Sequence, residues 1–169
     1  MLTHLKERGV NLSLYPSSII ITEDYIYFII YNLLGQFEGY QRYNPLSLNK
    51  STKDLPRYYT YYNKEKVNPV WGVETLNPLI KDLYIVEGVF KATKLHNLGF
   101  NSLCIFGNSI NACKSFLNSL HYNLIAIGDN DKGGLNLIKE IGKGFQSPQD
   151  LDEMSDDDVL NLIKGFKSV

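Results

Sequence analysis

The chain has 169 residues, of which 44% are hydrophobic, enough for one good core or for a small domain beside a larger one. Lys and Arg total 17 and Asp and Glu total 18, so the sequence lacks the overall basic charge that by itself indicates nucleic-acid binding. No apolar stretch approaches the roughly 20 residues of a membrane span, and the N-terminal segment lacks the apolar core of a signal peptide. We therefore expect a cytoplasmic protein with no membrane partner.

The N-terminal part of the sequence is rich in β-strand patterns. Residues 1–10 predict a short helix that ends at Gly9. Residues 45–54 are polar without periodicity, which is typical of an exposed loop, and the turn at 33–36 indicates a hairpin. Apolar and aromatic runs predict strands at 19–22, 25–31, 37–43 and 57–62, and a brief strand or turn at 70–73.

Three continuous apolar runs in the C-terminal part predict buried strands of a parallel sheet, because a strand covered on both faces is apolar throughout. The runs are 83–86, 102–106 and 124–127. Apolar residues at helical spacing lie between the runs and after them, which gives alternating strands and helices. We therefore predict an α/β fold, a parallel sheet flanked by helices, preceded by a small β-rich lobe. A composition shift divides the chain into the lobe at 1–78 and the α/β domain at 79–169.

Carboxylates follow two of these runs: Glu87 ends the first, and Asp129 and Asp131 follow the last. Ligands of parallel sheets bind at the carboxyl ends of the strands, so we expect these side chains to meet. Converging carboxylates resist ionising together unless a cation neutralises them, and hard oxygen ligands indicate Mg²⁺ or Mn²⁺. Such a centre can carry out in-line phosphoryl transfer, with Glu87 also able to serve as a general acid or base. The alternative is that each acid is a solvated loop residue, but the glycines beside them indicate close approach of backbone or phosphate.

Basic and aromatic residues are interleaved in the β-rich part of the chain. Arg42, Arg57, Lys64 and Lys66 stand among tyrosines, and together they can provide phosphate contacts and stacking surfaces for a single strand of nucleic acid. The alternative is a solvated strand face with half-buried tyrosines.

The remaining titratable residues are assigned no catalytic role. The acids at 156–158 follow Ser155 and are expected to cap the final helix. The cysteines show no metal-ligand spacing and are expected as reduced core residues, and the histidines are expected on surface helices or loops. These residues are Cys104, Cys113, His4, His96 and His121.

Several motifs in combination resemble the Toprim domain shared by bacterial and phage primases, topoisomerases and several nucleases. The match lies in VEG followed by a helix and, further along, in GDNDKGG. The resemblance implies a Rossmann-like sheet in which Glu87, Asp129 and Asp131 bind catalytic Mg²⁺ or Mn²⁺. FIIYNLLGQFEGYQRYN is similar to the β-rich lobe that precedes Toprim in DnaG-type and phage primases, where an arginine recurs, here Arg42. QDLDEMSDDDVLNLI is similar to the primase tail, which implies further metal contacts from Asp150 and Asp152.

The sequence departs from this family at Lys91, in EGVFK, where many Toprim proteins carry an acid. A lysine at this position lowers the negative charge of the site or places a cation against a phosphate.

The resemblance implies a primase-like nucleotidyltransferase of phage or bacterial type, which joins nucleoside triphosphates into short RNA primers on single-stranded DNA. It implies further partners as well: a replicative helicase or a separate template-recognition protein, in a bacterial or phage-infected cell. Two alternatives stay open, a small Toprim nuclease and a catalytically silent nucleic-acid-binding replication accessory protein.

Overall fold

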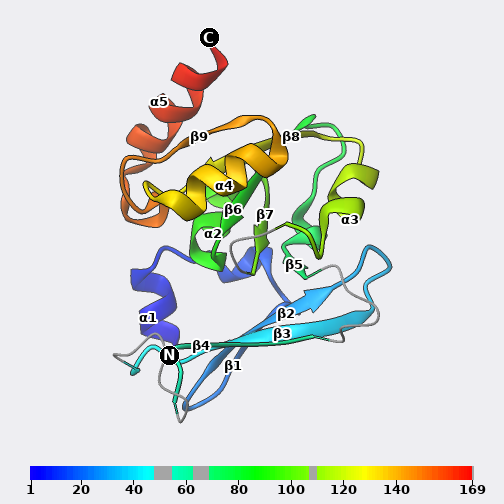
Figure 1. Cartoon of the computed structure of the whole chain (residues 1–169). Coiled ribbons are helices and arrows are strands. Elements are labelled where there is room, and N and C mark those ends of the chain that lie inside the picture. The colour runs from blue at the N-terminus through cyan, green and yellow to red at the C-terminus, as the bar shows by residue number, and fades with distance from the viewer. Residues whose placement is uncertain (48–54, 63–68, 107–109, 169) are drawn as a thin grey trace.

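The computed structural model describes residues 1–47, 55–62, 69–106 and 110–168. These residues form two sheets, an antiparallel sheet from the N-terminal half and a mostly parallel sheet from the C-terminal half, which lie one below the other in Figure 1. Within the described residues, no helix is long and apolar enough to cross a membrane.

The antiparallel sheet has four strands in the order β1-β2-β3-β4. The predicted hairpin joins β2 to β3, because Gly35 adopts a φ of 72° and the Asn32 side-chain oxygen accepts hydrogen bonds from two turn amides. Side chains alternate between the two faces of a strand, so Ile26 and Phe28 pack into the core while Tyr27 between them is partly exposed. The strands are β1 (Ile19–Ile21), β2 (Ile26–Tyr31), β3 (Phe37–Tyr43) and β4 (Tyr58–Tyr62).

The second sheet has five strands in the order β5-β7-β6-β8-β9, and all its pairings are parallel except that of β5 with β7. The predicted α/β fold with a preceding β-rich part is therefore confirmed. Strand β5 precedes the boundary expected near residue 78 and yet pairs in this sheet, and the division into two domains stays a prediction. The strands are β5 (Val70–Trp71), β6 (Asp82–Glu87), β7 (Asn101–Ile105), β8 (Asn123–Gly128) and β9 (Gly144–Gln146).

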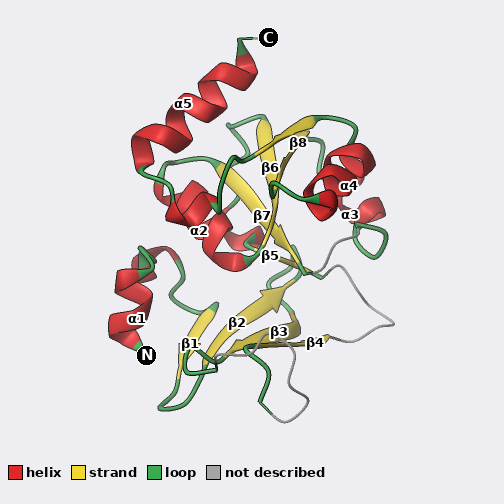
Figure 2. Cartoon of the chain, turned by 60° about the vertical axis from the view of Figure 1, so that its left-hand side comes forward, coloured by secondary structure: helices red, strands yellow, loops and turns green. Residues whose placement is uncertain are grey.

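Helices cover both faces of the parallel sheet (Figure 2). Apolar residues of α2 and α5 pack in one core on one face, and those of α3 and α4 pack in a second core on the other face. Short 3-10 turns, η1 (Leu12–Leu14), η2 (Val73–Thr75) and η3 (Leu151–Glu153), connect the elements. The helices are α1 (Leu2–Glu7), α2 (Val89–Asn97), α3 (Lys114–Ser119), α4 (Lys132–Ile141) and α5 (Asp156–Lys167).

Aromatic side chains join the antiparallel sheet to the α/β part. Trp71 is fully buried, and Phe28 meets it edge-on at a ring-centroid distance of 5.8 Å. Phe28 also meets Phe90 of α2 at 5.7 Å. Because edge-to-face contacts between buried rings add to the energy of burial, these rings fix the position of β2 relative to α2.

The expectation that all three histidines lie at the surface was wrong for His96. Only 8% of His96 is exposed, and its Nε2 donates a hydrogen bond of 2.8 Å to the Ser102 carbonyl oxygen. The side chain is buried because it lies on the face of α2 that packs against β7 and the N-terminal segment around Tyr15. Both cysteines are buried and free, as expected.

Candidate active site

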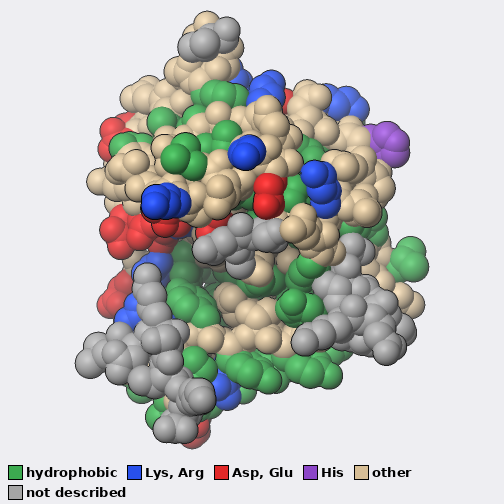
Figure 3. Space-filling model, viewed as in Figure 1, with side chains coloured by type: hydrophobic (Ala, Val, Ile, Leu, Met, Phe, Trp, Pro, Cys, Tyr) green, Lys and Arg blue, Asp and Glu red, His purple; other side chains and the backbone are tan. Residues whose placement is uncertain are grey.

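The carboxyl ends of β6 and β8 lie side by side, because the two strands pair in parallel with Val86 opposite Ile127. Glu87 ends β6 and Asp129 follows β8, so the register brings both acids to the same edge of the sheet. Both line a cavity of about 400 Å³, together with Asp150 and Asp152 from the segment before and within η3. Figure 3 shows acidic side chains gathered at one side of the molecule, at the level where the two sheets meet, with basic side chains beside them.

Two glycines let α4 begin directly against the end of β8. A Cβ atom on Gly128 would lie 2.4 Å from the Gly134 carbonyl oxygen, and one on Gly134 would lie 2.1 Å from the Asp129 carbonyl oxygen. Neither position has room for a side chain. The close backbone approach expected from the glycines in GDNDKGG is therefore present, and it sets where Asp129 leaves the strand.

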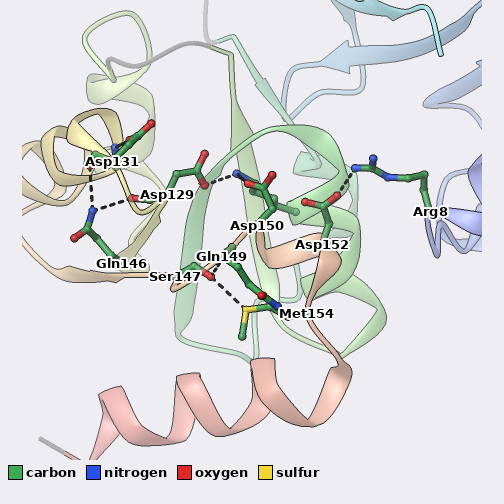
Figure 4. Close-up of polar contacts among 11 residues, drawn as sticks. Arg8, Asp129, Asp131, Gln146, Ser147, Gln149, Asp150, Asp152 and Met154 are labelled. Carbon is green, nitrogen blue, oxygen red and sulfur yellow. Dashed lines mark hydrogen bonds and ion pairs between the residues drawn. The ribbon is translucent and has the colours of Figure 1, made fainter. Parts of the chain in front are cut away.

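Asp131 lies apart from the other predicted acids. It is the N-cap residue of α4, and its side chain accepts a hydrogen bond of 2.8 Å from the Gly134 amide. Figure 4 shows Asp129, Asp150 and Asp152 in succession, with Asp131 beyond Asp129 at the start of the helix. Asp131 is not among the residues that line the cavity. The role that its side-chain contact shows is that of a helix cap.

Lys91 reaches from the first turn of α2 into the group of acids. Its ammonium group is ion-paired with Asp129 and lies 3.1 Å from the Asp150 carboxylate. Only 8% of the residue is exposed. Burial lowers the pKa of Lys91, but hydrogen bonds and charge interactions with Asp129 and Asp150 outweigh it, so the net pKa lies above its ordinary value.

Two further basic side chains are ion-paired with acids that follow Asp150 in the chain. Arg8, which follows α1, is ion-paired with Asp152, and Lys94 of α2 lies 2.5 Å from Asp156. The Arg8 guanidinium also lies 4.3 Å from the centre of the Phe90 ring. Arg8 lines the cavity but was not among the predicted site residues. No local pattern could have indicated it, because its partner stands 144 positions away.

Glu87 differs from these acids because one of its oxygens has no partner. Its Oε1 atom is buried and accepts no hydrogen bond from any described residue. Burial raises the pKa of the Glu87 carboxyl, the charges of Asp129 and Asp131 raise it further, and Lys91 lowers it. A buried oxygen without a donor is unfavourable in a folded protein unless something else binds it.

The fit to a divalent metal is partial. In the described part of the chain, no three acidic, histidine or cysteine side chains converge closely enough to enclose a metal ion. Mg²⁺ is, however, usually held by only one or two carboxylates, together with waters and phosphate oxygens. Glu87, with its unpartnered oxygen, and Asp129 supply two carboxylates at one edge of the cavity. These two residues fit such an ion, although Asp129, like Asp150 and Asp152, is also paired with a cation of the chain.

No protein-family model matches the sequence, and no curated protein sequence matches it. Solved structures do match. The E. coli primase catalytic core superposes with a TM-score of 0.69 at 14% identity, over 99% of this chain and 71% of that one. The zinc-binding and RNA polymerase domains of the Aquifex aeolicus primase superpose with a TM-score of 0.70 at 15% identity, over 99% of this chain and 55% of that one. For the primase fragment of the bacteriophage T7 primase-helicase protein the TM-score is 0.67 at 16% identity, over 96% of this chain and 73% of that one.

The chain has the fold of the DnaG-type primase catalytic core. These matches extend over both sheets, because they cover 96% or more of the chain. The expectation of a primase-like core that includes the β-rich part is thus confirmed at the level of the fold.

Within the primase-core fold, the predicted nucleic-acid residues are separated by the antiparallel sheet. Arg57 lines the acidic cavity, and its Nε donates a hydrogen bond of 2.9 Å to the Ser47 carbonyl oxygen. Tyr58 also lines the cavity. Arg42 points to the opposite face of the sheet, because it alternates with the inward-facing Gln41 and Tyr43.

On that outer face, the Arg42 guanidinium lies 4.5 Å from the centre of the Tyr25 ring and 5.4 Å from that of Tyr59. Tyr40 and Tyr61 stack on the same face with ring centres 5.6 Å apart. Lys64 and Lys66 lie outside the described residues. The predicted basic and aromatic groups therefore do not form one surface: Arg57 belongs to the cavity and Arg42 to the outer face.

Proposed function

We propose that this chain is a primase-like nucleotidyltransferase of the Toprim type, which joins nucleoside triphosphates into short RNA primers on single-stranded DNA. The observation that carries the proposal is the pair Glu87 and Asp129, which line one cavity at adjacent strand ends of a primase-core fold. A bound Mg²⁺ or Mn²⁺ would supply charge neutralisation for the transferring phosphates.

The protein's own residues provide the rest of the chemistry in this proposal. Glu87 lines the cavity and has one buried oxygen without a partner, so its carboxylate can bind the cation or accept the proton of the attacking hydroxyl. Arg57 lines the same cavity and can bind the triphosphate. Asp131 adds negative charge beside Glu87 from the start of α4, and we propose it as a third ligand of the cation.

The proposal for a nucleic-acid partner is supported by the solved neighbours. They include a DnaG primase catalytic domain bound to single-stranded DNA and the RNA polymerase domain of the Mycobacterium tuberculosis primase in complex with a double-stranded DNA oligomer. We propose single-stranded DNA as the template of this chain. A helicase or a template-recognition protein remains a proposed additional partner.

One observation favours a second function, that of a catalytically silent replication accessory protein. The Asp129 carboxylate is already ion-paired with Lys91. If this pair excludes all divalent ions, the chain binds nucleic acid without catalysis, and titration with Mn²⁺ would detect no bound ion.

The test is incubation of the protein with single-stranded DNA, labelled nucleotides and Mg²⁺ or Mn²⁺. We expect short RNA products that disappear in Asp129→Ala. Asp156→Asn is the matched control, because Asp156 is an exposed acid that pairs with Lys94 outside the cavity, and it should keep the activity. DNA degradation without RNA synthesis would favour the nuclease and overturn the proposal. DNA binding without either reaction would favour the accessory protein.

A further inference from the structure

The charged residues of the acidic cavity nearly balance one another. Its lining includes five carboxylates, from Glu87, Asp129, Asp150, Asp152 and Glu153, and three basic groups, from Arg8, Arg57 and Lys91. With every group ionised, the formal charge of the lining is two negative. One divalent cation cancels this charge, whereas two would leave an excess of two positive charges. If Asp131, which lies outside the lining, is counted as well, one ion leaves one negative charge and two leave one positive charge.

The position between Asp129 and Asp150 is already filled by a positive group. The Lys91 ammonium is ion-paired with both carboxylates, one after strand β8 and one before η3. In sites with two metal ions, shared carboxylates hold the ions about 3.5–4 Å apart. Here the carboxylates of two separate segments share an ammonium group instead.

Lys91 is held in this position by the packing of its helix. Its neighbours Val89, Phe90 and Ala92 are all buried in the core beneath α2. The lysine side chain itself is only 11% exposed. Swinging the ammonium group away would leave the Asp129 carboxylate, which is 31% exposed, without its partner, which is unfavourable.

The remaining acids differ in whether a carboxylate oxygen lacks a partner in the chain and can bind a ligand. Asp152 is ion-paired with Arg8. Of these acids, Glu87 alone has a buried oxygen that no described residue contacts. Glu87 therefore offers, beside Asp129, a buried acceptor that no described residue uses.

We propose that Lys91 is a cation supplied by the protein at the position of a second metal ion, so that the cavity binds one divalent ion, through Glu87 and Asp129 with Asp131 as the third ligand proposed above. This proposal rests on the proposed metal-dependent function. It assigns Lys91 the role of a positioning residue, since it joins the segment of Asp150 to the end of β8.

Removal of the lysine charge should change the number of bound ions. Lys91→Met keeps most of the side-chain volume and frees Asp129 and Asp150 to share a cation. We expect one Mn²⁺ per chain in the unaltered protein and two in Lys91→Met. In Lys91→Met/Asp150→Asn the second ion should be lost, because one of its carboxylates is gone.

The experiment is a Mn²⁺ titration in which electron paramagnetic resonance measures the free ion. Lys94→Met is the matched control, because it removes a lysine of the same helix that pairs with Asp156 outside the cavity, and it should bind one ion. Thermal unfolding checks that each variant is folded, and Lys91→Gln, which keeps a polar group, repeats the count if the methionine variant does not fold.

The proposal would be overturned by two ions or none in the unaltered protein, by one ion in a folded Lys91 variant, or by a second ion that persists in the double variant. RNA synthesis measured in parallel separates this inference from the proposed function. One bound ion without RNA synthesis would refute the function and leave the count intact, whereas RNA synthesis with two bound ions would refute the count.

Discussion

The Tyr15 hydroxyl lies 2.6 Å from Nδ1 of His96. The Ser102 carbonyl oxygen can only accept, so the proton of the neutral imidazole is on Nε2, and Nδ1 accepts from Tyr15. Tyr15 precedes the antiparallel sheet and His96 ends the packed face of α2. This contact therefore ties the N-terminal segment to the α/β part of the chain.

His96 should make the stability of the protein depend on pH. Burial lowers the pKa of His96 to about 4, whereas an unfolded chain has about 6.5. The unfolded state binds the proton first as the pH falls, so stability is fully present above about pH 6.5 and decreases by roughly 3 kcal/mol toward pH 4. Urea unfolding across this range would measure the loss.

His96→Gln removes this titration and should flatten the curve over the same pH range, although it lowers stability at neutral pH. The control is His121→Asn, since His121 is exposed and its φ of 55° is one that asparagine tolerates. A His96→Gln curve as steep as that of the unaltered protein would show that other groups cause the dependence.

The glycine contact between β8 and α4 gives a second prediction. Gly134→Ala places a Cβ within 2.1 Å of the Asp129 carbonyl oxygen, so it should destabilise the fold by more than about 2 kcal/mol and displace Asp129. Gly165→Ala, in α5 with no atom within 4 Å of its Cβ, should instead stabilise the protein by roughly 0.5–1 kcal/mol. Chemical unfolding of both variants tests the pair; equal effects would contradict the close approach.

Asp131 offers a way to separate capping from chemistry. Asp131→Asn retains an oxygen for the Gly134 amide, so the free energy of unfolding should change by only a few tenths of a kcal/mol, whereas Asp131→Ala should lose about 1 kcal/mol. If Asp131 also contributes a needed negative charge, both variants lose RNA synthesis. Full synthesis by the asparagine variant would show that Asp131 is a cap alone.

Replacement of Glu87 should stabilise the metal-free protein but remove its stabilisation by a bound metal ion. Because burial disfavours the ionised carboxyl, Glu87→Gln should stabilise the metal-free protein, by less than about 1 kcal/mol since the side chain is half-buried and solvent screens it. Mn²⁺ should raise the melting temperature of the unaltered protein and leave that of Glu87→Gln unchanged. Thermal unfolding with Mn²⁺, and again with an excess of chelator, provides the comparison; an equal response of both proteins would exclude Glu87 as a ligand.

The sequence predicted those parts of the site that depend on local patterns. Glu87 and Asp129 follow apolar runs, and parallel pairing of those runs places their ends together. Contacts between distant segments carried no such signal: Lys91 meets Asp150, and Arg8 meets Asp152 across 144 positions. These ion pairs depend on how η3 packs over α2, which is a property of the folded chain.

The face to which Arg42 points was likewise beyond the reach of the sequence. A shift of one residue in strand register reverses the face of every side chain, and the inner face of β3 is set by Tyr43, which packs on Phe90 of a distant helix. The same limit explains His96, because helical spacing shows which residues share a face of α2 but not which faces meet another element.

Arg57 and Arg42 can be distinguished because they lie on opposite faces of the antiparallel sheet. Arg57→Ala should weaken binding of a nucleoside triphosphate in the absence of DNA, by roughly tenfold, because a charge-assisted contact in the cavity is lost. Arg42→Ala should leave that affinity unchanged, since its guanidinium stacks with Tyr25 and Tyr59 on the outer face.

If Arg42 contacts the template as predicted, its alanine variant should instead weaken binding of a single-stranded oligonucleotide and reduce the salt dependence of that binding. Fluorescence anisotropy with a labelled nucleotide and a labelled oligonucleotide measures both affinities. Loss of nucleotide binding in Arg42→Ala would mean that the outer face reaches the cavity. Unchanged affinity for both ligands would restrict nucleic-acid contacts to the face of the sheet that carries Arg57 and Tyr58.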